Sequence, residues 1–234
     1  MGMTTLNQPV WQWDEMRQVG TDYASEAEVE TYDRRMSEVR DVAAENRAIL
    51  DGLPLGPESV LLEIGTGTGA LARAAAARCR RVVAVDVSAM MLQYARRRAE
   101  REGLANLEFV HAGFLTYASP PATVDAVVTG LALHHLPDLW KAVALERIRG
   151  WLKPGGILCL NDVVFDWGQE GCRAYFDRLV GAMAASSREP FIRHIRQEYS
   201  TLAWIMEGLL VRAGFKILSA QTKEFLVRYC CRAV

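Results

Sequence analysis

The sequence contains no long apolar run and no excess of charge of either sign. No segment approaches the roughly 20 consecutive apolar residues that a membrane-spanning helix requires. The first residues do not form the basic segment and apolar core of a secretory signal. The net charge is −1, so the composition gives no bulk attraction to nucleic acid or to a membrane surface. We expect a cytoplasmic protein that binds neither.

Cysteine is scarce and shows no ligand spacing. The five cysteines form neither a C-x-x-C pair nor a metal-ligand pattern, and an odd number without a pattern fits a reducing compartment. Cys79 and Cys159 lie in apolar surroundings and are expected to be small core residues. The sequence also lacks internal repeats. We therefore expect no metal site, and a single large α/β domain, for which 234 residues are sufficient.

The most informative segment is an apolar run that breaks into a glycine-rich turn. Residues 60–64 are apolar except for Glu63, and glycine then occupies positions 65, 67 and 69. Glycine lets the backbone turn sharply and approach a ligand closely, and the helix that follows offers unpaired N–H groups. A second apolar run, 82–85, ends on Asp86, where a carboxylate can accept both ribose hydroxyls. The arrangement indicates a nucleotide-like ligand at the edge of a parallel sheet.

Strands and helices alternate along most of the chain. The predicted strands cover residues 60–64, 82–85, 107–111, 124–129 and 157–161, and the predicted helices cover 26–50, 69–79, 88–102 and 138–152. This alternation is typical of βαβ units and a parallel sheet.

The pattern changes after residue 162. Apolar residues between 172 and 183 recur with helical spacing, a loop is expected over 186–194, and a further helix is expected over 198–213. Two predicted strands, 215–220 and 224–230, then follow with three residues between them. So short a connection requires an antiparallel hairpin.

The glycines alone leave two cofactors open. A G-x-G-x-x-A pattern from position 65 fits the dinucleotide fingerprint. A carboxylate at Glu63 would repel an approaching pyrophosphate, however, and suits a ligand with an amino group or a positive charge. Together with Asp86, the spacing Glu63-x-Gly65-x-Gly67-x-Gly69 resembles the S-adenosylmethionine (SAM) loop of class I SAM-dependent methyltransferases.

The resemblance continues from residue 60 to residue 162. The segments 86–92, 133–136 and 152–156 are similar to the family's segment after the ribose acid, its fourth-strand exit and the turn into its fifth strand. The closing hairpin is similar to the family's last antiparallel strand, and a dehydrogenase would not normally show it. The resemblance implies an α/β, doubly wound, Rossmann-like fold. Its seven-stranded, mostly parallel sheet has the order 3-2-1-4-5-7-6, with an antiparallel last strand and a helical cap.

The resemblance also implies which residues bind SAM and leave S-adenosylhomocysteine (SAH) as product. The glycine loop lies against the methionine part, Asp86 takes the ribose, and an N-terminal Tyr-Asp element at Tyr32 closes over the cofactor. The family often has an acid after its third strand for the adenine amino group. This chain has Gly113 there, so adenine would rely on backbone groups and on Phe114. The expected cofactor-binding residues are Glu63, Gly65, Thr66, Gly67, Gly69, Asp86, Val87, Met91, Gly113, Phe114, Gly130 and Tyr32.

Methyl transfer needs few special side chains. The reaction is an in-line displacement, so the enzyme mainly aligns the nucleophile and excludes water. A general base is needed only if the acceptor must lose a proton, and the candidates are His134, His135 and Asp162. Each also has a purely structural interpretation. An acceptor pocket could be lined by large side chains that are otherwise expected in the core, namely Trp11, Trp13, Phe165, Trp167, Phe176 and Met183.

We therefore expect a SAM-dependent methyltransferase that acts on a small molecule at O, N, C or S, as a monomer or homodimer. The alternatives are an NAD(P)-dependent oxidoreductase and a non-catalytic SAM-binding protein. The Asn-Pro-Pro-Tyr type of motif of DNA amino-methyltransferases is absent after the fourth strand. The expected organisation is an N-terminal helical cap (1–55), a SAM-binding core (56–162), a substrate-cap insertion (163–200), and a C-terminal helix and hairpin that complete the core (201–234).

Overall fold

The computed structural model describes residues 9–17, 29, 32–33 and 41–234. The helix predicted over 26–50 is therefore described mainly at its end, as α2 (Val42–Asp51), and most of the rest of that prediction lies outside the described residues. Asp41 caps α2, because its side chain accepts a hydrogen bond from the Ala44 amide at 2.9 Å.

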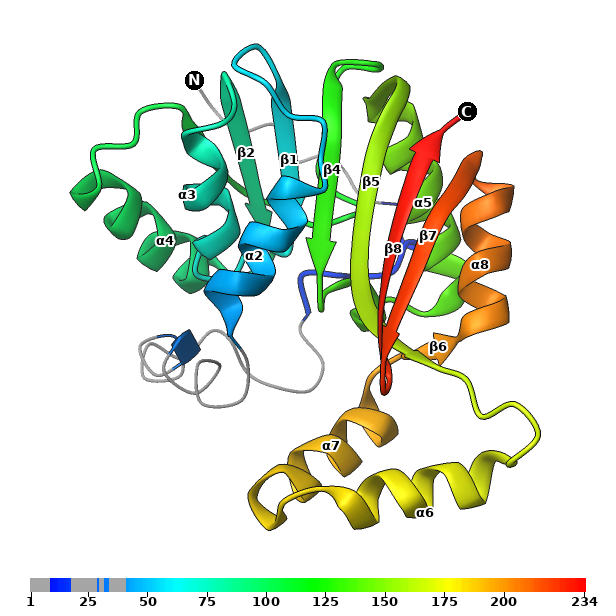
Figure 1. The fold of residues 1–234 in the computed structure, drawn as a ribbon. Helices are drawn as coiled ribbons and strands as arrows, with labels where there is room; N and C mark the ends of the chain where they lie inside the picture. Colours follow the sequence, from blue (N-terminus) through cyan, green and yellow to red (C-terminus); the bar gives the residue numbers. More distant parts are fainter. Residues whose placement is uncertain (1–8, 18–28, 30–31, 34–40) are drawn as a thin grey trace.

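A central sheet organises the described chain (Figure 1). Its strand order is β3-β2-β1-β4-β5-β8-β7; the strands from β3 to β5 are parallel, and β8 is antiparallel to both β5 and β7. The predicted order is confirmed once the short β6, which pairs with β5, is set aside. The strands are β1 (Val60–Ile64), β2 (Arg81–Asp86), β3 (Leu107–His111), β4 (Val124–Gly130), β5 (Leu152–Phe165), β6 (Thr201–Leu202), β7 (Phe215–Lys223) and β8 (Leu226–Ala233).

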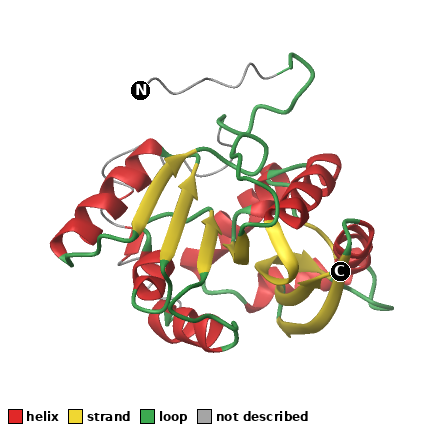
Figure 2. Ribbon diagram, turned by 90° about the horizontal axis from the view of Figure 1, so that it is seen from above, coloured by secondary structure: helices red, strands yellow, loops and turns green. Residues whose placement is uncertain are grey.

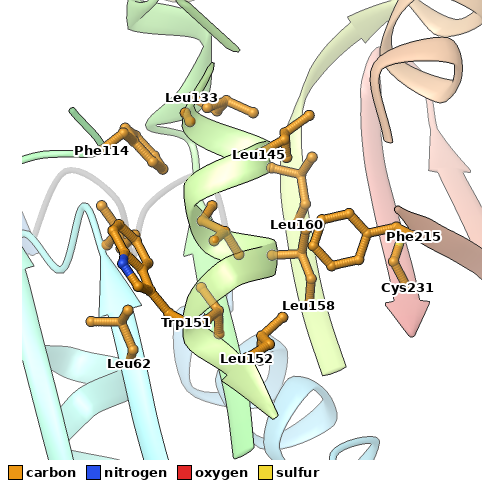
Figure 3. Close-up of a cluster of buried hydrophobic side chains, with 14 of the residues drawn as sticks. Leu62, Phe114, Leu133, Leu145, Trp151, Leu152, Leu158, Leu160, Phe215 and Cys231 are labelled. Carbon is orange, nitrogen blue, oxygen red and sulfur yellow. The ribbon is translucent and has the colours of Figure 1, made fainter. Parts of the chain in front are cut away.

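Helices lie on both faces of the sheet (Figure 2). One buried cluster joins alternate strand residues such as Leu61 to α2 and α3, and a second joins residues such as Leu62 to α5 and α8. Figure 3 shows the second cluster, in which Leu145 of α5 meets Leu158 and Leu160 of β5. The remaining helices are α3 (Ala70–Ala76), α4 (Ala89–Arg101), the 3₁₀ turn η1 (Leu133–His135), α5 (Asp138–Trp151), α6 (Cys172–Ala182), α7 (Ala185–Gln197) and α8 (Ala203–Arg212). The sheet is thus covered on both sides, as a parallel sheet requires.

The predicted loop over 186–194 is wrong, because this segment belongs to helix α7 with Pro190 inside it. A proline costs one intrahelical hydrogen bond. Phe191 and Ile195, one helical turn apart, pack into a cluster with α6 and the end of β5. This apolar contact outweighs the local cost of the proline, which the sequence pattern alone does not reveal.

Two further boundaries differ from the prediction. Residues 201–202 pair with β5 as β6, so the next helix begins at Ala203 and not at 198. The hairpin pairs as far as Lys223 with Leu226, which leaves a two-residue turn at Glu224 and Phe225. Glu224 has φ 58°, a conformation for which glycine or asparagine is the usual signal. The turn therefore carried no recognisable sequence marker.

A helix that spans a membrane must be both long enough and apolar enough to cross it. None of the helices in the described part of the chain meets both conditions.

Candidate active site

The glycine-rich loop leaves β1 and is anchored to the neighbouring strand. The amides of Gly65 and Thr66 both donate to the Val85 carbonyl, at 2.8 and 3.0 Å. The Gly69 amide then donates to the Thr66 carbonyl at 2.9 Å, and α3 begins at the next residue. The loop therefore lies at the carboxyl ends of the parallel strands, where open α/β sheets bind their ligands.

The three glycines of the loop have positive φ angles of 77°, 54° and 73°, which favour glycine at each position. Their surroundings differ. A Cβ at Gly65 would lie 2.4 Å from the Ala132 Cβ, and one at Gly69 would lie 2.9 Å from the Ala95 Cβ. A Cβ at Gly67 would meet no described atom within 4 Å. Packing against the protein thus requires the first and third glycines, whereas Gly67 faces open space.

Asp86 connects the loop to the end of β2. Its carboxylate is buried and accepts hydrogen bonds from the Gly67 amide and the Ser88 amide, both at 2.8 Å. Burial raises the pKa of this carboxyl despite those two donors. Ser88 in turn caps α4 by accepting from the Met91 amide at 3.2 Å, as predicted. Asp86 therefore fixes Gly67 in addition to presenting its own carboxyl edge.

Glu63 lies behind the loop at the end of β1. Its side chain is 7 % exposed, and its Oε2 accepts a hydrogen bond from the Thr66 hydroxyl at 2.7 Å. Burial raises the pKa of Glu63 to about 8, and the charge of Asp86 adds to this, whereas the Thr66 hydrogen bond opposes it. The carboxyl therefore titrates near neutral pH, and a ligand cation placed against the loop would favour its ionised form.

We expect Glu63→Gln to lessen the loss of stability at alkaline pH. The folded-state pKa of about 8 lies above the ordinary value of 4.5, so the folded chain retains a proton that the unfolded chain releases. This contribution is complete below the unfolded-state pKa and is lost as pH rises through about 8. Urea unfolding at pH 6 and pH 9 should show the native protein losing about 3 kcal/mol more than the variant over this interval. Equal losses would contradict the assignment, and exposed Glu58→Gln is the control.

A cavity of about 860 Å³, counting its opening to solvent, lies in front of the loop. Asp33 accepts a hydrogen bond from Thr68 at 2.6 Å, which places the neighbouring Tyr32 at the cavity wall. A second hollow adjoins the first along the loop and is lined by Glu63, Thr66 and Thr68. Of the residues expected to bind cofactor, the first cavity is lined by Tyr32, Gly65, Gly67, Asp86, Val87, Met91, Gly113, Phe114 and Gly130. Gly69 lines neither space and is the N-cap residue of α3.

The N-terminal segment contributes three residues to this cavity, and the sequence had marked only Trp13 among them. Trp13, Glu15 and Arg17 all line it. Glu15 stands beside Gly113, where the sequence had suggested that only backbone groups and Phe114 would be available. No motif surrounds Glu15, and its contact with Gly113 joins distant parts of the chain, so spacing could not have found it.

His134 and Asp162, two of the three candidate bases, form a buried pair away from the cavity wall. Asp162 accepts from the His134 amide at 3.0 Å, from its Nδ1 and from the Val163 amide at 2.8 Å. The Nε2 of His134 contacts the Glu198 carboxylate at 3.1 Å. Burial opposes the charge of His134, but the carboxylates of Asp162 and Glu198 outweigh it and raise the pKa to about 9. Neither His134 nor Asp162 lines the cavity.

The same cluster holds the set of described residues whose spacing a metal ion could use. Ligand atoms of His134, His194 and Glu198 lie within 4.8 Å of one another. Each already has a protein partner: Glu198 contacts both histidines, and His194 also contacts the Ser200 hydroxyl at 2.7 Å. The sequence had given no sign of the group because its members come from η1, from α7 and from the residue that follows α7. These contacts explain the cluster as a network of hydrogen bonds and ion pairs among its own side chains.

His135 is the candidate base that lines the cavity. Burial and the neighbouring charge of His134 lower its pKa to about 4, so the imidazole is neutral at physiological pH. The rings of the two histidines lie 4.4 Å apart. The two adjacent histidines therefore differ in protonation. His134 is charged and lies between carboxylates, whereas His135 is neutral and faces the cavity.

Most of the aromatic residues considered for an acceptor pocket have another place. Phe165, Trp167, Phe176 and Met183 belong to the cluster that joins α6 and α7 to β5 and do not line the cavity. Trp11 is exposed and stacks on Trp140 at 6.2 Å. Trp13 alone of the six suggested residues lines the cavity, and it contacts Tyr199 edge-on at 5.5 Å.

The chain is similar to known methyltransferases in sequence and in fold. A family model described as a methyltransferase domain matches residues 61–156. An uncharacterized methyltransferase of Geobacillus kaustophilus is 27 % identical over 201 residues, which cover 84 % of this chain and 89 % of that protein. An uncharacterized methyltransferase of Mycobacterium tuberculosis is 41 % identical over 114 residues, 48 % of this chain and 55 % of that protein.

Solved structures share the fold. A SAM-dependent methyltransferase from Aquifex aeolicus has a TM-score of 0.63 at 19 % identity and covers 90 % of this chain and 99 % of its own. A geranyl diphosphate C-methyltransferase from Streptomyces coelicolor, solved with Mg²⁺, geranyl-S-thiolodiphosphate and SAH, has a TM-score of 0.66 at 14 % identity over 82 % of this chain and 76 % of its own. The comparisons support neither the oxidoreductase nor the non-catalytic alternative. The matching domain, the methyltransferase relatives and the common fold together support a class I SAM-dependent methyltransferase.

Proposed function

We propose that this protein transfers the methyl group of SAM to a small-molecule acceptor held in the cavity in front of the glycine loop. The methionine part of SAM lies along the loop and Gly130, the ribose lies on Asp86, and the adenine lies between Val87, Met91 and Phe114. The acceptor enters beside Trp13 and His135.

The observation that carries this proposal is the pairing of Asp86 with Gly67. A buried carboxylate at the end of β2 holds the amide of the loop glycine whose Cβ position is open, and both residues line the cavity. A ribose and its 5′ substituent need these two features side by side: an acceptor for the hydroxyls and a backbone without a side chain.

The cavity also suits a small acceptor. Its walls include the apolar side chains of Ile64, Leu136 and Trp13, and small-molecule sites are usually lined mostly by such side chains. In the transfer, the acceptor's lone pair forms a bond to the methyl carbon as the carbon–sulfur bond breaks, and SAH leaves. The residues around the cavity align the two molecules and exclude water, the main requirements of such a displacement.

Calorimetry with SAM, SAH and NAD⁺ tests the cofactor first. We expect SAM and SAH to bind with one site per chain and NAD⁺ not to bind. Mass spectrometry of the ligand that copurifies, followed by a screen for SAH release over classes of phenols, amines, thiols and carbon acids, would then identify the acceptor. Binding of NAD⁺ without SAM, or no SAH release with any class, would contradict the proposal.

We expect His135→Ala to lower kcat by about 10²–10⁴-fold for an acceptor that must lose a proton. The neutral imidazole of His135 faces the cavity and can take that proton. Because its pKa is near 4, kcat of the native protein should stay constant between pH 8 and pH 6 instead of falling as an ordinary histidine becomes protonated. Steady-state kinetics with saturating SAM measure both effects, and SAH affinity should change little.

His134→Ala is the matched control for the adjacent histidine. It removes the cation between two buried carboxylates, so we expect a loss of about 3–5 kcal/mol in the free energy of unfolding. If His135→Ala keeps full kcat with an acceptor that must lose a proton during the reaction, the base assignment is wrong.

A further inference from the structure

Glu15 brings a buried carboxylate from the N-terminal segment into the cavity. Its side chain is 7 % exposed. One oxygen, Oε1, accepts three hydrogen bonds, from the Leu115 amide at 2.8 Å and from the Thr116 amide and hydroxyl at 2.7 Å each. These bonds fix the position and orientation of the carboxylate against the segment that follows β3.

The other oxygen of Glu15 is unused. Oε2 is buried and has no hydrogen-bond partner among the described residues. A carboxylate oxygen can accept more than one hydrogen bond, and leaving one buried without a donor is unfavourable. Because Glu15 lines the cavity, a ligand in that space could supply the missing donor.

The position of Oε2 shows which part of a ligand it would meet. A Cβ added to Gly113 would lie 2.4 Å from Oε2 and 2.8 Å from the Val87 Cγ1. The Glu15 carboxylate thus occupies the space that a side chain at position 113 would take. This space lies beside Val87, the residue after Asp86. A base attached to a ribose on Asp86 would extend along Val87 towards this point.

We propose that Glu15 Oε2 accepts a hydrogen bond from the exocyclic amino group of the adenine, so that the N-terminal segment completes the cofactor site and selects adenine. The amino group is the hydrogen-bond donor on the adenine edge. Hypoxanthine carries a carbonyl oxygen at that position, which a carboxylate repels. This inference rests on the proposed function, because it assumes the ribose on Asp86.

The same segment links base recognition to the acceptor side of the cavity. Trp13, two residues before Glu15, lines the cavity and packs edge-on against Tyr199. Gln12 donates a hydrogen bond to the Leu115 carbonyl at 3.5 Å. Adenine bound to Glu15 would therefore help to hold Trp13 over the acceptor space.

The test compares SAH with S-inosylhomocysteine, in which hypoxanthine replaces adenine. Calorimetry on the native full-length chain should show that SAH binds at least tenfold more tightly. Glu15→Gln should weaken SAH about tenfold and should not weaken the inosine analogue, because the amide NH2 can donate to the carbonyl oxygen that the carboxylate repels. Glu58→Gln, an exposed substitution, should leave both affinities unchanged.

Three results would overturn the inference. The native protein could bind both ligands equally, a test that needs no variant. Alternatively, Glu15→Gln could weaken both ligands by the same factor, which would mean that Glu15 only anchors the segment, or it could leave both affinities unchanged. In each case SAH still binds the native chain and the proposed function stands. If neither ligand binds the native chain, the proposed function fails, and this inference fails with it.

Discussion

Gly130→Val is expected to abolish measurable SAM binding while the protein stays folded. Gly130 ends β4 and lines both the cavity and the adjoining hollow. A Cβ there would meet no described atom within 4 Å, and the residue is not among those with positive φ. The added side chain would therefore occupy ligand space without collision or backbone strain in the free protein. We expect an affinity loss of at least about 100-fold, or ~2.7 kcal/mol, in SAH calorimetry.

Gly150→Val is the matched control for this steric test. Gly150 lies in α5, away from the cavity, and its Cβ position is equally open. It should leave SAH affinity unchanged. Substitution of Gly67 would be a less clean test, because its φ of 54° adds backbone strain to any steric effect on the ligand. If Gly130→Val binds SAH normally, the methionine part does not lie where we place it.

Asp86→Ala should weaken SAM binding by about 1–3 kcal/mol, or roughly 5- to 150-fold. The variant removes the acceptor for the ribose hydroxyls. It also frees the Gly67 amide, whose hydrogen bond to Asp86 orients the loop, so the effect should lie towards the upper end of this range. Calorimetry with SAH measures the change in affinity. Thermal unfolding shows whether the loss of the hydrogen bond to Gly67 also destabilises the fold.

Asp125→Ala is a control at the opposite, amino-terminal end of the parallel strands. Asp125 also accepts a hydrogen bond from a backbone amide, that of Val60 at 2.8 Å, where β1 begins. Its removal should lower stability without changing SAH affinity. Equal binding by the Asp86 variant and the native protein would refute the ribose assignment.

The parts of the fold that local signals specify were predicted from the sequence. The glycine turn and the Ser88 cap each depend on residues close together in the chain, whereas the strand order was predicted from the family resemblance. The failures came where tertiary packing overrides local preference. Helix α7 contains Pro190 because Phe191 packs against β5 and α6, and the hairpin turns at Glu224 without a turn residue.

The sequence by itself indicated the family resemblance, the expected SAM loop and the expected ribose acid, because one strand–turn–helix–strand unit contains the residues of the loop and the acid. Only the tertiary structure decided which of two adjacent histidines faces the cavity, since buried carboxylates from β5 and the residue after α7 enclose His134 and leave His135 open. It also brought Glu15 to the space beside Gly113. Contacts between distant segments depend on how the whole chain folds back on itself, and residue spacing carries no record of them.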